Sequence, residues 1–223
     1  MSNHARHFKY EESDVSYIGI YASGRTKIVI TQSPNDKFHF FKNFDALDAD
    51  EAVEENPDVN HSLSHSFLTK HGSLFFMSKS SYDSMNSENK PEEISIMVPE
   101  GSVVPMELHA SDHSEIEINI PAKGCRIEAQ GNSDIKLDNV CDGININAFG
   151  DSKVLLKSSS TSVRPAIFTR GRSVVDAGNI DFKDGFIHIN GDSSVTFRSQ
   201  ESCLISKDRK ITSYSNKNSV TFG

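Results

Sequence analysis

The chain has 223 residues, of which 36% are hydrophobic, and 31 acidic against 23 basic residues give it a formal net charge of −8. This length suits one large domain or two small ones, and the apolar fraction is too high for a disordered chain. The negative charge repels phosphate backbones and no local basic stripe offsets it, so we expect no nucleic-acid partner. No apolar run reaches the roughly 18 residues that span a bilayer, so we expect no membrane insertion.

Residues 1–16 are polar and form an N-terminal tail in our interpretation. They contain no apolar segment of the kind found in secretory leaders, so we expect no signal peptide in this chain. Three explanations stay open: the protein remains inside the cell, leaves by a signal-independent route, or is shown here without its leader.

The first strand-like pattern surrounds Gly24. Alternating apolar residues precede it at Ile18 and Ile20 and follow it at Ile28 and Ile30. Such alternation predicts two half-buried strands joined by a tight turn.

Three further strand-like segments follow, and two polar insertions interrupt them. The segments are "KFHFF" (37–41), "SLFFM" (73–77) and "EISIMVP" (93–99), and the insertions are 43–71 and 78–92. We interpret residues 17–104 as N-terminal coils or as a cap over a sheet edge. Such a cap is expected because an exposed edge invites pairing with other chains.

The insertion 43–71 is acidic and contains two histidines four residues apart, His61 and His65. On a helix both imidazoles would share one face and could bind a metal. The surrounding residues match neither the H-E-x-x-H helix nor the EF-hand loop. We therefore expect a solvated segment in which His61 and His65 are weak metal-ligand candidates, and we expect no cofactor.

From residue 105 onward one turn recurs every 19 to 21 residues. It consists of a glycine with a serine two positions later, and aliphatic or small residues stand four and two positions before the glycine and four and six after it. The pairs are Gly131 and Ser133, Gly150 and Ser152, Gly171 and Ser173, and Gly191 and Ser193. The same frame extends backward with Asp112 and forward with Lys207 at the glycine position. It predicts strand, tight turn, strand and a looser corner in each unit.

A single unit cannot bury its apolar face, but stacked units merge their aliphatic columns into one core. We therefore predict an all-β fold, a single-stranded parallel β-helix (β-solenoid) with coils of about 20 residues. It occupies residues 17–223 as one domain, with regular coils over 105–223 and a weaker third side near 179–182. Glycine suits a corner that needs positive φ. The serines are predicted to hydrogen-bond along the stack rather than to act as nucleophiles.

The stretches "IYASGRTKIVITQS", "HGSLFFMS" and "EISIMVPEGSVVPMELHASDHSEIEI", with the G-x-S-x-V turns after them, resemble the auto-transporter adhesin head GIN-type domain family of bacteria. The resemblance covers residues 17–215. It implies a parallel β-helix domain that is usually exported and has no known catalytic residues, so no site residue follows from it.

The sequence offers no recognisable catalytic arrangement. Cys125, Cys141 and Cys203 are odd in number and form no C-x-x-C motif, which argues against a disulfide framework and a zinc site. Outward carboxylates are plentiful, but none pair at equivalent positions of neighbouring coils beside an aromatic platform. Neither a G-x-S-x-G elbow nor a phosphate-binding loop occurs. We therefore expect no enzymatic activity.

Two outward columns read from the frame are chemically mixed, and in them Leu155 and Phe168 form a candidate apolar spot for partner contact. The preferred hypothesis is a non-catalytic binding or scaffolding module that presents loops and a solenoid face to a protein or glycan partner. One alternative is a carbohydrate-active enzyme, a polysaccharide hydrolase or lyase, on the same scaffold. The other is a self-associating structural element that forms a homo-oligomer through the terminal strand 217–222.

Overall fold

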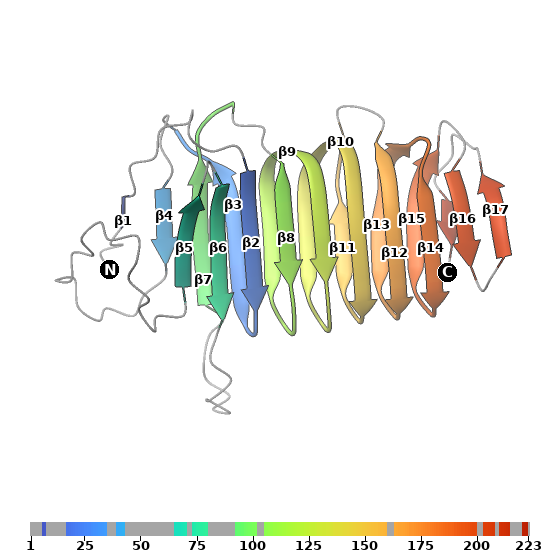
Figure 1. Cartoon of the computed structure of the whole chain (residues 1–223), viewed down its shortest axis with the longest axis horizontal. Coiled ribbons are helices and arrows are strands. Elements are labelled where there is room, and N and C mark those ends of the chain that lie inside the picture. Colours follow the sequence, from blue (N-terminus) through green and yellow to red (C-terminus); the bar gives the residue numbers. More distant parts are fainter. Residues whose placement is uncertain are drawn as a thin grey trace.

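The computed structural model describes eleven segments of the chain, and every regular element in them is a strand (Figure 1). The described residues are 6–7, 17–34, 39–42, 65–70, 73–79, 92–101, 105–159, 163–199, 203–207, 210–214 and 220–222. Stacked parallel strands form a β-solenoid with coils of about 20 residues, which confirms the predicted fold class.

The strands are β1 (Arg6–His7), β2 (Tyr17–Ser23), β3 (Thr26–Gln32), β4 (His39–Lys42), β5 (His65–Lys70), β6 (Ser73–Lys79), β7 (Glu92–Val98), β8 (Met106–Ala110), β9 (Glu115–Ala129), β10 (Asp134–Gly150), β11 (Lys153–Leu156), β12 (Arg164–Gly171), β13 (Val174–Phe182), β14 (Phe186–Gly191), β15 (Ser194–Ser199), β16 (Cys203–Lys207), β17 (Lys210–Tyr214) and β18 (Val220–Phe222). The long strands β9 and β10 each bend from one side of the solenoid onto another, so their two halves pair with different neighbours.

Two long parallel ladders form the broad sides of the rod. The front face, turned toward the viewer in Figure 1, contains β2, β8, β12, β14 and β16 with the C-terminal halves of β9 and β10. The back face contains β3, β11, β13 and β15 with the N-terminal halves of β9 and β10. A tight corner connects a front strand to the back strand that follows it.

The core consists of aliphatic columns that repeat from coil to coil. On the inner side of the front face Ile146, Ile167 and Ile187 stack in register, and each is fully buried. Burying such a side chain contributes about 1.5–3 kcal/mol. On the third side Phe182 is fully buried and stacks on Phe197 at 5.3 Å between ring centroids. The segment 179–182 therefore contributes to the core, as its pattern predicts.

The N-terminal coils do not stack in chain order. Strand β2 pairs with β8 on one side and with β6 on the other, and β3 lies likewise between β9 and β7. The coil of 17–34 is therefore inserted between the coil of β6 and β7 and the coil that begins with β8. The coil of 17–34 has a tight turn at Gly24, whose φ is 70°, whereas residues 80–91 separate β6 from β7.

Antiparallel strands finish both ends of the stack. At one end β4 pairs with β7, β5 with β6, and β1 with β4. At the other end β17 folds back on β16, and the terminal strand β18 lies antiparallel on β15. Such pairings occupy edges that would otherwise be open to another chain.

The last predicted coil has the wrong register. Ile205 pairs with Ile187 and Lys207 with Ile189, so Lys207 lies two residues before the corner position rather than at it. Ile211 belongs to β17, which runs antiparallel to β16 instead of continuing a coil. The interval from Gly191 to Lys207 is shorter than every other interval in the frame, so a full coil does not fit in it.

Candidate functional site

The corner residues that the sequence singles out lie together along one edge of the rod. We call the set Asp112, Gly131, Gly150, Gly171 and Gly191 the corner column. All five have positive φ, between 63° at Asp112 and 91° at Gly171, and so does Gly24 at φ 70°. A Cβ added to Gly171 would lie 2.9 Å from the carbonyl oxygen of Gly150, which is closer than real Cβ atoms approach. Positive φ favours glycine throughout the corner column, and at Gly171 the stacking also leaves no room for a Cβ. Asp112, in the first coil of the column, has the same backbone conformation without being glycine.

The serines beside the corner are fully buried, and most of them bond within the stack. The Ser133 hydroxyl donates to the Ala110 carbonyl at 3.0 Å, and that of Ser173 donates to the Ala148 carbonyl at 2.9 Å. Ser193 donates to the Thr169 hydroxyl at 2.8 Å. The Ser152 hydroxyl is buried and has no hydrogen-bond partner among the described residues. A buried hydroxyl held by a neighbouring carbonyl is not placed to attack a substrate.

The outward side of the front face carries two different groups of side chains. Over β2, β8 and β9 lies a group that we call the polar network: Tyr17, Tyr21, Glu107, His109, Arg126, Glu128 and Gln130. Over β12, β14 and β16 lies a group that we call the aromatic patch: Phe168, Phe186, His188 and Leu204. The strand between the two groups, β10, presents Asn145 and Asn147.

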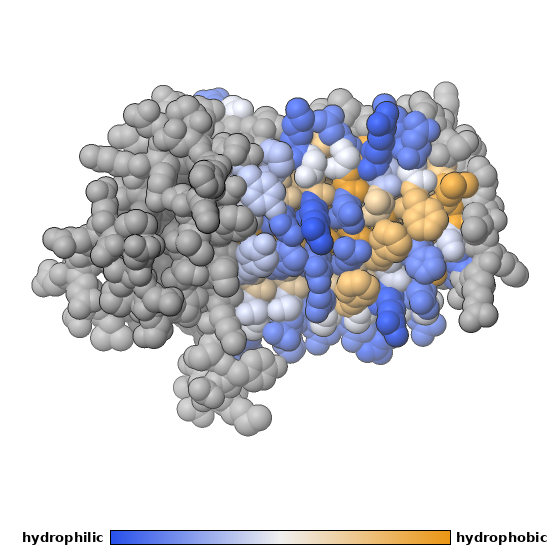
Figure 2. Space-filling view, in the orientation of Figure 1, coloured by the Kyte–Doolittle hydropathy of each residue, from blue (hydrophilic) through white to orange (hydrophobic). Residues whose placement is uncertain are grey.

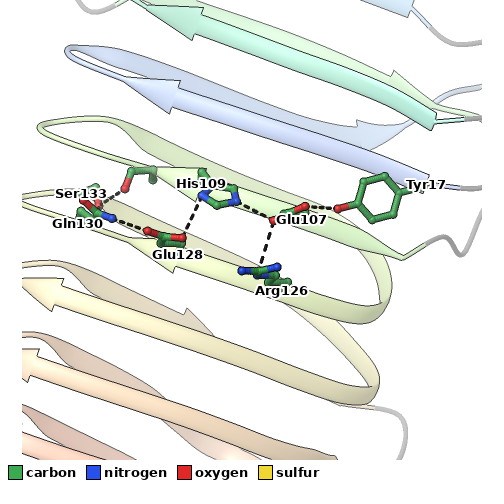
Figure 3. Close-up of polar contacts among 8 residues, drawn as sticks. Tyr17, Glu107, His109, Arg126, Glu128, Gln130 and Ser133 are labelled. Atoms are coloured by element: carbon green, nitrogen blue, oxygen red, sulfur yellow. Dashed lines mark hydrogen bonds and ion pairs between the residues drawn. The ribbon is translucent and has the colours of Figure 1, made fainter. Parts of the chain in front are cut away.

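The polar network is centred on His109 and Glu107 (Figure 3). The Nε2 atom of His109 lies 2.9 Å from Glu107 Oε1, and its Nδ1 atom lies 3.4 Å from Glu128 Oε2. The Tyr17 hydroxyl donates to the second oxygen of Glu107, and Arg126 Nε lies 3.6 Å from the first. Tyr21 stacks on the imidazole with a centroid distance of 4.6 Å and an interplanar angle of 12°.

These contacts pair the ionisable groups of the polar network with one another. The hydrogen bonds from Tyr17 and His109 lower the pKa of Glu107. Burial and the hydrogen bond to that carboxylate raise the pKa of Tyr17. Both nitrogens of His109 can donate only when the ring is imidazolium, and in that form two cations, His109 and Arg126, face the two carboxylates Glu107 and Glu128. Each charged group of the network then contacts a group of opposite charge.

The aromatic patch is compact, with Phe168 and Leu204 exposed and Phe186 and His188 half-buried. The ring centroid of Phe168 lies 5.8 Å from that of Phe186 and 6.1 Å from that of His188, and Phe186 and His188 are stacked at 6.4 Å with 12° between their planes. Phe168 is 39% exposed and Leu204 is 48% exposed. Figure 2 shows these hydrophobic side chains gathered over β12, β14 and β16, beside a hydrophilic area toward the N-terminal coils.

Two arginines flank the patch on the same strand as Phe168. In β12 the outward positions alternate as Arg164, Ala166, Phe168 and Arg170, and both arginines are exposed. Within the part of the chain that the structure describes, neither guanidinium forms an ion pair. On the adjacent strand Asn147 lies in register with Phe168.

The structure separates the two residues predicted to form an apolar spot. Phe168 lies in the aromatic patch on the front face. Leu155 lies in β11 on the back face, in register with Lys136 and Asp176. They are separated because Leu155 follows a corner and Phe168 precedes one, so the two columns belong to different sides of the rod.

The sequence frame missed most of the patch. His188 stands in the same outward column as Phe168, whereas Phe186 stands in the neighbouring outward column. With Lys207 at the corner position the frame would set Leu204 beside His188, but Leu204 pairs with Phe186. The signal in the sequence is the alignment of all outward positions with Ile205 beside Ile187, which brings Leu204 next to Phe186.

The metal-ligand candidates fall outside the side chains that the structure describes. His61 lies outside the described residues, and His65 begins β5, of which only the backbone is described. Among the side chains that are described, no group of three or more His, Cys, Asp or Glu residues is arranged to hold a metal ion. The insertions 43–71 and 78–92 likewise lie outside the described residues, apart from the strand segments 65–70, 78–79 and 92.

The three cysteines all lie in the described part of the chain and form no disulfide there. Cys125 and Cys203 are buried in the core, and Cys141 is half-buried. Burial raises the pKa of the Cys125 thiol to about 12. Because the thiolate is the nucleophilic form of cysteine, this residue is unreactive at neutral pH.

No helix long and apolar enough to cross a membrane occurs in the described part of the chain.

No family model matches the chain, and no curated protein matches it. Among solved structures it is similar to a proposed cell adhesion protein from Clostridium sporogenes, with 11% identity and a TM-score of 0.32 over 87% of this chain and 76% of that chain. It is also similar to a proposed lipid-binding protein from Parabacteroides distasonis, with 17% identity and a TM-score of 0.27 over 92% of this chain and 96% of that chain.

Proposed function

We propose that this chain is a non-catalytic binding module that engages its partner through the front face of the solenoid. The observation that carries the proposal is the exposed aromatic patch on a rigid parallel sheet. Phe168 and Leu204 keep 39% and 48% of their surface in solvent while the backbone beneath them is fixed by fully buried Ile167 and Ile205 at its back. A surface that is ordered before binding loses little conformational entropy when a partner arrives.

The polar network supports binding rather than catalysis. A general acid that works near neutral pH needs a raised pKa, and the pKa of Glu107 is lowered. Glu107 and Glu128 are both engaged by His109, so neither carboxylate is held ready for a sugar ring. The resemblance of the sequence motifs to an adhesin-head family is in keeping with a binding role.

The proposal is tested by retention on two panels, one of immobilised polysaccharides and one of immobilised purified proteins. The full chain is compared with a front-face variant, Phe168→Ser with Phe186→Ser, and with a matched back-face variant, Leu155→Ser. We expect at least one panel member to retain the wild-type chain. The front-face variant is expected to bind that member at least tenfold more weakly, because centrally placed aromatic residues dominate binding energies, and Leu155→Ser is expected to leave binding unchanged.

Reducing ends are assayed in parallel on every polysaccharide. The proposal is overturned if no member retains the wild-type chain, or if the front-face and back-face variants bind as well as it does. Accumulation of reducing ends that Glu107→Gln abolishes would instead establish a carbohydrate-active enzyme. Melting temperatures of all variants show whether any loss of binding reflects unfolding.

A further inference from the structure

We infer that the ligand of the front face is an anionic polysaccharide, a sugar polymer that carries carboxylate or sulfate groups, lying along the solenoid axis across β10, β12, β14 and β16. This inference rests on the proposed function and adds the chemical class of the partner. It follows from three features of the front face: aromatic rings, side-chain amides and two exposed arginines that form no ion pair with any residue that the structure describes.

The aromatic patch provides a platform for sugar rings. Phe168, Phe186 and His188 have ring centroids within 6.4 Å of one another, and Phe186 and His188 are nearly parallel. The face of an aromatic ring is electron-rich, so it attracts the weakly positive C–H groups on one side of a pyranose ring. A row of such rings holds a polymer by its apolar side without binding its hydroxyl groups.

The neighbouring amides supply partners for those hydroxyl groups. Asn147 lies in register with Phe168, Asn145 with Ala166, and Asn190 with Arg170. An amide can donate and accept hydrogen bonds at once, as a sugar hydroxyl does. Polar groups placed beside the aromatic rings compensate the loss of water from a hydroxylated ligand, which a purely apolar surface would not.

The arginines define the charge of the ligand. Arg164 and Arg170 stand on either side of Phe168 in β12, and Arg170 is two residues away, or about 7 Å along the strand. In a chain with a net charge of −8, these two exposed guanidinium groups, which form no ion pairs among the described residues, place positive charge on both sides of Phe168. The planar guanidinium fits a carboxylate or sulfate oxygen pair, so acidic sugars satisfy it.

The regular stacking gives the direction of the polymer. Equivalent side chains in successive coils recur at the spacing of neighbouring strands, about 4.8 Å. Asn147, Phe168 and His188 therefore form a straight row along the axis, one residue in each coil. A linear polymer that follows this row contacts every coil from β10 to β16.

A protein partner fits this surface less well. Stable protein interfaces bury about 800 Å² on each side, and their centres are apolar and depleted of charged groups. Here three apolar side chains, Phe168, Phe186 and Leu204, are interleaved with amides and flanked by arginines. Such mixed chemistry matches a ligand that is itself hydroxylated and charged throughout.

The test measures binding of the full chain to three soluble polymers: alginate as a polyuronate, dextran sulfate as a sulfated polymer, and unmodified dextran as a neutral one. The variants are Arg170→Gln, Phe168→Ala and a matched control, Arg198→Gln, which removes an exposed arginine from the back-face strand β15. We expect binding to at least one anionic polymer and none to dextran. Arg170→Gln and Phe168→Ala are each expected to weaken it about tenfold, since one charged hydrogen bond or one stacking ring has roughly that effect.

Arg198→Gln is expected to change the dissociation constant less than twofold, and raising the salt concentration is expected to weaken binding. The inference is overturned if dextran binds as well as the anionic polymers, or if Arg198→Gln weakens binding as much as Arg170→Gln, which indicates unspecific attraction. It is also overturned if only a purified protein binds and Phe168→Ala abolishes that binding. In that case, or if a neutral glycan binds through Phe168, the binding role of the front face stands and only the ligand class is wrong.

Discussion

The corner column and the outward side of the front face run side by side along the same coils, yet they differ in how much their chemistry changes. From Gly131 to Gly191 the corner repeats one residue type with positive φ. Over the same coils the front face changes from the acidic Glu128 through Asn147 to Phe168. Stacking therefore restricts the residue type at the corner column, whereas it leaves the outward positions of the front face free to vary.

The contrast has a direct physical cause. At the corner each coil rests on the backbone of the coil before it, so a Cβ at Gly150 would lie 3.2 Å from the backbone nitrogen of Gly131. On the front face the outward side chains point into solvent and meet only their neighbours in the ladder. A residue there can change without moving the backbone, so selection for a ligand acts on it independently of selection for the fold.

Replacing a corner glycine gives the largest expected effect. Gly171→Ala is expected to lower the free energy of unfolding by about 2 kcal/mol or more, because alanine is strained at φ 91° and its Cβ would lie 2.9 Å from the Gly150 carbonyl oxygen. Urea denaturation of the two proteins measures the change.

Gly143→Ala is the matched control for this substitution. Gly143 does not have the left-handed backbone conformation, and a Cβ there would meet only the Arg164 carbonyl oxygen at 3.8 Å. This variant is expected to be as stable as the wild type or up to about 1 kcal/mol more stable. Equal losses at the two glycines would refute the stacking explanation of the corner column.

The serines beside the corner are expected to give the next largest effect. Ser173→Ala removes a buried hydrogen bond to the Ala148 carbonyl and is expected to cost about 1 kcal/mol. Ser152→Ala removes a buried hydroxyl that has no partner in the described part of the chain and is expected to be neutral or stabilising. Thermal unfolding of both variants tests the difference, and a larger loss in Ser152→Ala than in Ser173→Ala would contradict it.

The corner and the core could be predicted from sequence because every coil places the same structural requirements on them. Each coil needs a residue with left-handed backbone conformation at the corner and apolar residues at the same buried positions. Gly150 and Ile146 therefore recur as Gly171 and Ile167. The frame assigns the wrong register to the last coil, because the interval after Gly191 is too short for a full coil. It makes no prediction for the position of the coil of 17–34, because the order in which the N-terminal coils stack leaves no periodic signal.

The candidate site could not be predicted to the same degree because its residues do not repeat. Phe168 was identified as an outward residue, but its contacts with Phe186 depend on the register of neighbouring strands. The pairing of His109 with both Glu107 and Glu128 joins two strands of different coils. The stacking of Tyr21 on that ring joins residues far apart in sequence, and only the insertion of β2 beside β8 brings them together.

The charges of the polar network are expected to give a smaller, pH-dependent effect. The pKa of Glu107 is lower in the folded chain than its ordinary value. Its contacts therefore stabilise the fold above the ordinary pKa of a glutamate, about 4.3, and this contribution is lost as the pH falls through the folded value. Wild type is expected to exceed Glu107→Gln by about 0.5 kcal/mol at pH 6, and this difference is expected to shrink as the pH falls below about 4.3. Unfolding measured across this range tests the sign, and a gap that widens toward acid would contradict it.

The smallest expected effect is the change in the free energy of unfolding when a ring of the aromatic patch is removed. It shows whether the patch contributes to the stability of the fold. Phe168→Thr places a β-branched residue in a strand and removes a side chain that is already 39% exposed. The free energy of unfolding is therefore expected to change by no more than about 0.5 kcal/mol, while binding to an anionic polymer is weakened about tenfold. Calorimetry of the free chain measures the first quantity. If the variant instead lost more than about 1 kcal/mol, the exposed rings would be holding neighbouring coils together, and their exposure would no longer argue for a ligand.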